Sequence, residues 1–343
     1  MDSITQFVLG AALGELVAGK KAGNKALFWG GVAGTIPDLD IVFSPLFTEL
    51  ENLSVHRGFS HSLVFGFLAA PVFGWLLSKV YRKPSAMVVK DWVKLFFWGI
   101  FTHPLLDAFT LYGTQLFLPF SNYRVALNTI SIVDPGYTLP LLLSMILVMV
   151  FRRRKPDLSF AINKAGLVLS SGYLILTIFN KWYVERIFSA ALNEQRITVD
   201  NSLSNPVLFS NLLWYCVARN DSTCFIGYYS LLQKSKTVRF ESYQRNTYLM
   251  HVIKDKEGLE KLKWFSKNFY VAEMKSDTLC FYDVRFGKTD LFSNEDNEKT
   301  FVFYFKIPKP ENHPLMIQQY ISREDMNFSE FIDQLFRRIK SEH

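Results

Sequence analysis

The segment His61–Val80 reads HSLVFGFLAAPVFGWLLSKV and decides how the first half of the chain folds. Apart from His61 and Lys79, it carries no ionisable side chain. The hydrocarbon core of a bilayer is about 30 Å thick, and roughly 20 mostly apolar residues in a helix cross it. The segment therefore predicts a membrane-spanning helix.

Comparable apolar stretches lie on both sides of this segment. The chain of 343 residues is 49% hydrophobic, and the excess falls in its first half, where short polar turns separate the apolar runs. The first stretch is short and could be a signal peptide, but Asp2 replaces the basic leader of such a peptide, so we expect it to be retained. The sequence predicts a polytopic α-helical membrane bundle of about six spans. The expected spans are Ile4–Ala18, Lys25–Phe43, His61–Val80, Trp92–Leu111, Pro135–Phe151 and Lys164–Tyr183.

The second half has the mixed composition of a folded aqueous domain. We expect a membrane domain over residues 1–182 and an α+β soluble domain over residues 183–343. Runs rich in aromatic and β-branched residues predict a mainly antiparallel sheet, and apolar residues at helical spacing predict two helices. The expected strands are Leu212–Arg219, Phe225–Tyr229, Leu279–Tyr282 and Phe301–Phe305, and the expected helices lie near Glu257–Lys267 and Ser329–Ser341.

Three cysteines, Cys216, Cys224 and Cys280, all fall in the second half of the chain. They are too few for a disulfide scaffold, and their spacing does not fit a zinc knuckle. Cys216 and Cys224 could pair across a hairpin if this domain lies outside the cytoplasm, or they could be free buried thiols. The sequence leaves both alternatives open.

Basic residues are distributed unevenly among the turns that join the expected spans. If the spans alternate in direction, one side of the membrane receives basic clusters, and the other side receives Arg57 and Arg124. Lys and Arg concentrate in cytoplasmic loops, so we expect a bacterial inner-membrane protein whose C-terminal domain is extracytoplasmic. These topology signals account for the net charge of +7, and no nucleic-acid binding is expected. The clusters are Lys20, Lys21 and Lys25; Arg82, Lys83 and Lys90; and Arg152, Arg153, Arg154 and Lys155.

Ionisable residues within or beside the spans gather at the extracytoplasmic face. They come from three motifs, PDLD at residues 37–40, HRGFSHS at 56–62 and HPLLD at 103–107. Charged groups in a bilayer are costly unless they are paired, solvated or bound to a metal, so their convergence at one depth requires a cause. We expect the metal ligands Asp38, Asp40, His56, His61, His103 and Asp107, with Asp2 and Gln6 as accessory residues at the same face.

The spacing of these residues supports a shared site. His103 and Asp107 are four residues apart and project from the same face of a helix. In the HRGFSHS motif, Gly58 allows the backbone to bend, and Ser60 is expected to cap the following helix. Arg57, beside two histidines, could bind an anionic substrate oxygen or anchor the chain at the interface.

Histidine and carboxylate ligands suit zinc, with manganese as an alternative, and one ion or two could bind. Such a site activates water for hydrolysis. The sequence therefore predicts a hydrolase of phosphoester or other ester bonds, with Asp40, His61, Asp107 and Arg57 as its catalytic residues. Two other functions stay open: an ion-coupled or proton-coupled transporter, and a metal-stabilised membrane anchor for a binding domain. The sequence indicates no oligomeric state.

The opening MDSITQ at residues 1–6 and the three motifs together resemble the bacterial family of LexA-binding, inner-membrane-associated metal-dependent hydrolases. The resemblance covers roughly the first half of the chain and implies an integral-membrane hydrolase. Many members of the family have a histidine at the position of Gln6. The His-x-x-x-Asp pattern is also weakly similar to the zinc phospholipase C and fungal zinc nuclease superfamily, which implies phosphoester substrates, including lipid head groups at the membrane surface.

A further motif, YDVRFG at residues 282–287, resembles an element that recurs in longer members of the same family. Its Arg285 could bind an anionic substrate. Alternatively, Arg285 is a strand residue with a solvated charge.

Overall fold

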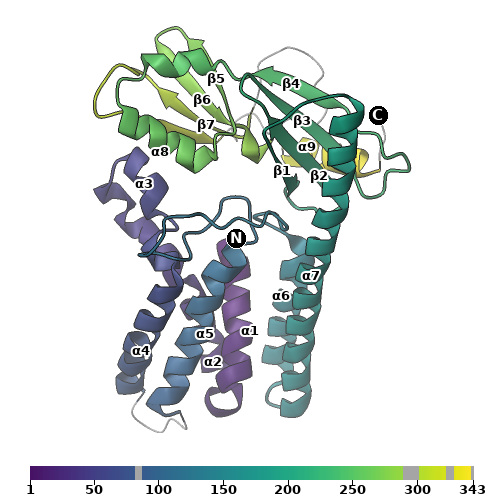
Figure 1. Ribbon diagram of the computed structural model, residues 1–343. Coiled ribbons are helices and arrows are strands. Elements are labelled where there is room, and N and C mark those ends of the chain that lie inside the picture. Colours follow the sequence, from purple (N-terminus) through teal and green to yellow (C-terminus); the bar gives the residue numbers. More distant parts are fainter. Residues whose placement is uncertain (82–86, 289–300, 322–327, 341–343) are drawn as a thin grey trace. The chain divides into compact units, whose positions relative to one another are not determined.

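The computed structural model describes residues 1–81, 87–288, 301–321 and 328–340. The chain divides into two compact units. The first unit comprises Met1–Ser44, Val55–Phe179 and Leu208–Ser210, and the second comprises Pro45–Ser54, Asn180–Val207 and Asn211–His343. Figure 1 labels the helices and strands of both units.

The first unit is helical. Among the described residues, three helical segments are long and apolar enough to cross a membrane: Asn24–Leu46, Leu63–Val80 and Pro156–Glu194. A fourth, α6, is apolar but shorter. Each of the six expected spans contains a helix, but α1 (Ser3–Ala22) and α5 (Val89–Asp107) do not reach the hydropathy of a span, since both carry several charged residues. The helices are α1 (Ser3–Ala22), α2 (Asn24–Thr35), the 3₁₀ helix η1 (Ile36–Leu46), α4 (Leu63–Val80), α5 (Val89–Asp107), α6 (Pro135–Phe151) and α7 (Pro156–Glu194).

Glycines allow α1 and α2 to approach closely. A Cβ atom built on Gly10 would lie 2.3 Å from the carbonyl oxygen of Gly30, and one built on Gly30 would lie 2.4 Å from that of Gly10. Small residues four apart on facing helices permit this backbone contact, which larger side chains would prevent. The approach brings the C-terminal end of α2 beside the N-terminal end of α1.

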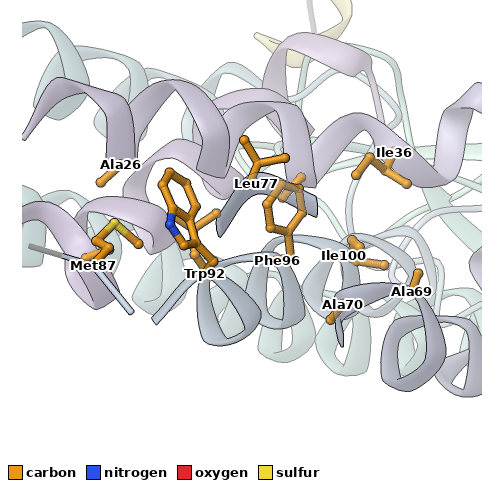
Figure 2. Packing of buried hydrophobic residues seen from close by; sticks show 12 residues of the cluster. Ala26, Ile36, Ala69, Ala70, Leu77, Met87, Trp92, Phe96 and Ile100 are labelled. Carbon is orange, nitrogen blue, oxygen red and sulfur yellow. The ribbon is translucent and has the colours of Figure 1, made fainter. Parts of the chain in front are cut away.

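Large apolar side chains fix α5 against its neighbours. Trp92, Phe96 and Ile100 are each 1% exposed and pack with Leu77 of α4 and Ala26 of α2. Figure 2 shows the three following one another along α5. Burying a side chain of this size stabilises the fold by about 1.5–3 kcal/mol, so α5 is held firmly at the position from which its last turn enters the site.

The basic clusters of three helices lie at one end of the first unit. Lys21 Nζ is 2.7 Å from Asp91 Oδ2, which joins the end of α1 to the start of α5. Arg152, which follows α6, donates a hydrogen bond of 3.1 Å to the carbonyl of Gly19. The HPLLD motif lies at the other end of α5. Two members of the expected clusters, Arg82 and Lys83, lie outside the described residues.

The segment between α5 and α6, residues 108–134, is irregular and runs beside the HRGFSHS motif. Gln115 N donates to the carbonyl of Arg57 (3.3 Å), and Leu63 N donates to that of Leu116 (3.0 Å). The motif itself contains the short 3₁₀ helix η2 (Phe59–His61). Ser62, not the expected Ser60, caps α4, and its side chain accepts a hydrogen bond from Phe65 N. The prediction for Ser60 was wrong because its hydroxyl donates a hydrogen bond to Asp40.

The second unit contains two four-stranded antiparallel sheets, which confirms the predicted sheet. The first sheet has the order β1-β2-β3-β4, and the second has the order β5-β6-β7-β8. The strands are β1 (Asn201–Pro206), β2 (Leu213–Arg219), β3 (Thr223–Ser230), β4 (Phe240–Gln244), β5 (Tyr270–Lys275), β6 (Thr278–Asp283), β7 (Phe303–Ile307) and β8 (Gln318–Ile321). The helices of this unit are α3 (Glu49–Val55), α8 (Lys256–Ser266) and α9 (Phe328–Ile339), with 3₁₀ helices at Thr247–Val252 and Val284–Phe286.

The C-terminal part of α7 covers the first sheet. Phe188 and Leu192 of α7 pack with Trp214 and Cys216 of β2 in one buried cluster. The strand register pairs Cys216 with Gly227 and Arg219 with Cys224, so the two thiols are not opposite each other. All three cysteines are free and buried.

At the start of α8, buried Asp255 caps the helix. Its carboxylate accepts hydrogen bonds from Gly258 N (2.9 Å) and Leu315 N (2.8 Å). These backbone donors favour the charged form and hold the pKa of Asp255 below its ordinary value.

Candidate metal centre

Four of the predicted ligands converge in the first unit: Asp38 of η1, His61 of η2, and His103 and Asp107 of α5. One ligand atom from each lies within 4.8 Å of the others. Both histidines and Asp107 are fully buried, whereas Asp38 is half-buried. The group is therefore enclosed on the sides of α5 and η2 and most accessible beside Asp38.

The distances within the group suit one tetrahedral ion. His61 Nε2 and His103 Nε2 are 3.1 Å apart, and Asp38 Oδ1 lies 3.3 and 3.4 Å from them. Asp107 Oδ2 lies 3.6 and 3.7 Å from the same nitrogens. Ligands about 2.0–2.1 Å from a tetrahedral zinc ion are separated by about 3.3–3.4 Å. The separations that involve His61 and His103 are therefore close to those of a tetrahedral zinc site.

Hydrogen bonds on the far edges of the imidazoles decide which nitrogens face the centre. His103 Nδ1 lies 2.6 Å from the carbonyl oxygen of Gly34, which can only accept, so Nδ1 carries the proton. Ser60 Oγ donates to Asp40 and must therefore accept from His61 Nδ1, 3.0 Å away. With the proton of each neutral ring on Nδ1, the Nε2 lone pair would face the centre, as a metal ligand requires.

Among the described residues, two buried oxygen atoms of Asp107 and Gln6 have no hydrogen-bond donor. Asp107 Oδ2 is one, although Arg57 Nε lies 3.2 Å away as an ion-pair partner. Gln6 Oε1 is the other, while Gln6 Nε2 donates to Asp107 Oδ1 (2.9 Å). An unsatisfied buried acceptor is costly. A cation bound by the four converging residues would satisfy Asp107 Oδ2, so the residues present fit a metal ion.

Asp40 and His56 do not join the group. Asp40 accepts from Ser60 Oγ (2.9 Å) and from Arg57 N (3.1 Å), and its Oδ2 lies 3.4 Å from His61 Nδ1. His56 Nδ1 is 3.0 Å from the other oxygen of Asp40. Since Asp38 reaches His61 Nε2, the two carboxylates lie at opposite edges of the His61 ring. Asp40 thus orients a ligand from behind.

Comparison with known proteins places this centre in a family. Residues 1–186, more than half of the chain, match the family described as YdjM inner membrane protein. The chain belongs to the YdjM inner membrane protein family. The matched residues contain all four converging ligands.

Two relatives of this YdjM family member are known by name. It is 32% identical over 146 residues to the uncharacterized protein YfhP of Bacillus subtilis (strain 168), covering 39% of this chain and 42% of YfhP. It is 28% identical over 110 residues to the inner membrane protein YbcI of Escherichia coli (strain K12), covering 32% of this chain and 61% of YbcI. The matches thus span less than two thirds of either relative. No solved structure matches the chain.

Arg57 lies at the edge of the candidate metal centre. It is 7% exposed, and its Nη1 lies 3.3 Å from Thr110 Oγ1, in addition to the Asp107 contact. Its φ of 57° is in the left-handed region, which a long side chain adopts at a cost of order 1–3 kcal/mol. Hydrogen bonds of its backbone to Asp40 and Gln115 maintain this conformation.

The remaining predicted residues lie elsewhere. Asp2 caps α1, accepting a hydrogen bond from Thr5 N (2.9 Å), while the N-terminal ammonium contacts Asp107. Arg285 belongs to the second unit, outside the region that matches the YdjM family. It is 1% exposed and forms a buried ion pair of 2.6 Å with Asp283. This pairing assigns Arg285 to the core of its own unit.

Two residues near the candidate metal centre were not predicted from the sequence. Arg124 had been noted as a loop charge, but it is buried, 3% exposed, and donates to the carbonyl of His56 (2.9 Å). Tyr112 lies against both Arg57 and Arg124. No spacing rule connects residues 57, 112 and 124, because their proximity depends on two irregular segments.

Proposed function

We propose that this protein is a membrane-bound metal-dependent hydrolase that acts on a phosphoester or other ester bond. The convergence of two imidazole Nε2 atoms and two carboxylates carries the proposal. The imidazole protons are on the far edges of both rings, toward Gly34 and Ser60. With these protons on Nδ1, both Nε2 atoms and both carboxylates can bind one cation, which is the proposed occupant.

Zinc is the proposed ion, since two imidazoles and two carboxylates suit it, and manganese is the alternative. Asp38, His61, His103 and Asp107 would hold it, and the amide oxygen of Gln6 could join them. The engagement of Asp40 by Ser60 Oγ and Arg57 N favours one ion over two.

When bound, such an ion supplies Lewis acidity and lowers the pKa of water, which is the chemistry of hydrolysis. The chain's own residues prepare the site for it. Asp40 fixes the ring of His61, Gly34 fixes that of His103, and Arg57 presents a cation beside Asp107 where a substrate oxygen would develop negative charge. Burial of these groups excludes water and strengthens their interaction with charge.

We also propose that the first unit is a multi-pass domain of the inner membrane, with the metal centre and the second unit on the extracytoplasmic side. The alignment of the basic clusters of α1, α5 and α6 at the opposite end from His103 supports this orientation. The clusters would then face the cytoplasm. A reporter fused after His343 that is active only outside the cytoplasm should be active; activity of a cytoplasm-specific reporter there would refute the orientation.

Metal content and hydrolysis, measured on the same preparations, test the function. The full chain is purified in detergent beside the variants His103→Gln and Asp107→Asn, with His251→Gln as a matched control because His251 is exposed in the second unit. All four are assayed for zinc and manganese by elemental analysis, and for hydrolysis of generic phosphoesters and carboxylesters.

We expect about one ion per chain in the parent protein and in the control, and loss of both metal and hydrolysis in the two site variants. Absence of metal from the folded parent protein after incubation with zinc would refute the metal centre. Stoichiometric metal without hydrolysis of either ester class would refute the hydrolase and favour the anchor or transport function.

A further inference from the structure

We propose that Arg57 and Arg124, both held against the aromatic ring of Tyr112, form an anion-binding pair that selects a phosphoryl group. The proposal rests on the proposed function, because the anion would bind beside the metal centre. It adds a substrate class and two residues, Tyr112 and Arg124, to that site.

The geometry of the pair is the first support. The guanidinium carbon of Arg57 lies 4.7 Å from the centre of the Tyr112 ring, and that of Arg124 lies 5.0 Å from it. A guanidinium within about 6 Å of a ring is attracted to its face. One ring thus holds two like charges in a buried region, where they would otherwise repel each other.

Hydrogen bonds and an ion pair fix both arginines relative to the metal ligands. Arg57 is bound through its N–H to Asp40 and through its carbonyl to Gln115, and its Nε lies 3.2 Å from Asp107 Oδ2. Arg124 is bound to the carbonyl of His56, the residue before Arg57. Holding two long side chains in place before a ligand arrives reduces the entropy lost on binding.

Charge balance is an independent reason to expect an anion. The carboxylates of Asp38, Asp40 and Asp107 carry three negative charges, and the guanidiniums of Arg57 and Arg124 carry two positive charges. A divalent ion would leave this set with a net charge of +1, even without the N-terminal ammonium. Buried net charge is unfavourable unless it is compensated, so the loaded site should attract an anionic ligand.

Phosphoryl groups match this arrangement better than carboxylesters do. A phosphoester carries negative charge before it reacts, whereas a carboxylester is neutral. Guanidinium groups bind phosphate oxygens through two parallel N–H donors, with charge-assisted hydrogen bonds. Phe120, 86% exposed, follows Tyr112 in the same segment, so the phosphoryl group could belong to a lipid as well as to a soluble molecule.

Binding of inorganic phosphate by the zinc-loaded full chain tests the pair without requiring turnover. Calorimetric titration would compare the parent protein with Arg124→Gln, Arg124→Lys and Tyr112→Leu, and with the exposed Arg154→Gln as a matched control. We expect the phosphate Kd to rise about 10-fold to 100-fold in Arg124→Gln, because a charge-assisted hydrogen bond is lost. Arg124→Lys should recover part of the loss, and the control should bind like the parent.

Zinc affinity, measured on the same variants, separates ligand binding from a purely structural role of Arg124. Unchanged zinc affinity with weaker phosphate binding supports the pair. An equal fall in zinc affinity and phosphate affinity in Arg124→Gln would overturn it, as would phosphate binding that is unaffected by the substitution. If Arg124→Gln does not fold, the same comparison of phosphate affinity with zinc affinity is made on Arg124→Lys and Tyr112→Leu. Weaker phosphate binding with unchanged zinc affinity again supports the pair, and any other result overturns it.

The outcome is distinguishable from failure of the proposed function. Phosphate binding that depends on Arg124, without hydrolysis of any ester, would support the anion-binding pair and refute the hydrolase. Carboxylester hydrolysis with no phosphate binding would support the hydrolase and refute the anion-binding pair. The source of the phosphoryl group is tested with para-nitrophenyl phosphate and with phosphatidylcholine vesicles containing phosphatidic acid. The readout is binding: weaker binding by Arg124→Gln than by the parent in either arm identifies that source, and unchanged binding in both arms overturns the proposal.

Discussion

Replacing Asp40 with asparagine tests how the centre is built. In the structure, the Asp40 carboxylate accepts hydrogen bonds from Ser60 Oγ and Arg57 N and lies 3.4 Å from His61 Nδ1. All three contacts are made by Oδ2, while Oδ1 faces His56 Nδ1. An asparagine keeps the shape and can place its one oxygen at the Oδ2 position, but it carries no negative charge, so the contacts to Ser60, Arg57 and His61 lose their charge assistance. Asp40→Asn should therefore loosen the His61 ring without removing a ligand.

The magnitude follows from the position of Asp40 behind a ligand. Loss of such a partner lowers metal affinity about 10-fold to 100-fold, which corresponds to about 1.4–2.7 kcal/mol. A hydrogen bond to a charged acceptor contributes a similar amount, about 1.5–3 kcal/mol. We expect zinc affinity to fall within this range while the stoichiometry at saturating zinc stays the same.

Chelator competition on the purified full chain measures the affinity, and elemental analysis at saturating zinc measures the stoichiometry. Asp91→Asn is the matched control, because Asp91 pairs with Lys21 at the other end of α5; it should bind zinc like the parent. A fall in stoichiometry would show that Asp40 is itself a ligand, as the sequence predicted. Unchanged affinity would refute the orienting role altogether.

Three further predictions concern the second unit. Asp255→Ala should destabilise the full chain by about 1–3 kcal/mol at pH 7, because it removes a helix cap and leaves a buried N–H unpaired. The pKa of Asp255 is lowered in the folded state, so its contribution to stability is complete above the unfolded pKa of about 3.9 and is lost as the pH falls below that value. Thermal unfolding should therefore show the stabilities of the variant and the parent converging in acid. A difference in stability that stays constant with pH would contradict this. Arg285→Ala should cost about 3–5 kcal/mol by leaving Asp283 buried and unpaired, yet leave phosphate affinity unchanged in the folded fraction; weaker phosphate binding would instead support a substrate role. Burial raises the pKa of Cys216 and Cys224 to about 12, so maleimide should label these thiols only after denaturation, and rapid labelling of the native chain would count against the described core.

Much of the molecule was accessible from the sequence. The apolar runs located the helices of the first unit, and aromatic and β-branched runs located β2, β3, β6 and β7. The candidate ligands were recognised because ionisable residues are costly within apolar segments. His103 and Asp107, four residues apart on one helix, face the same centre, as the spacing predicted. These features are local: each depends on residues within a few turns of one another.

Only the tertiary structure decided how the site is assembled. The close contact of α1 and α2 at Gly10 and Gly30 brings Gln6 beside α5 and Gly34 beside His103. This contact determines which imidazole nitrogen faces the centre.

The same reason explains the different positions of Asp38 and Asp40, which the sequence treated alike. They lie at opposite edges of His61, so one points into the centre and the other supports the ring. The contact of Arg57 and Arg124 with the Tyr112 ring depends on hydrogen bonds between two irregular segments. Sequence periodicity fixes neighbours along one helix, whereas side chains from separate elements meet only through packing and loop closure, which no local spacing encodes.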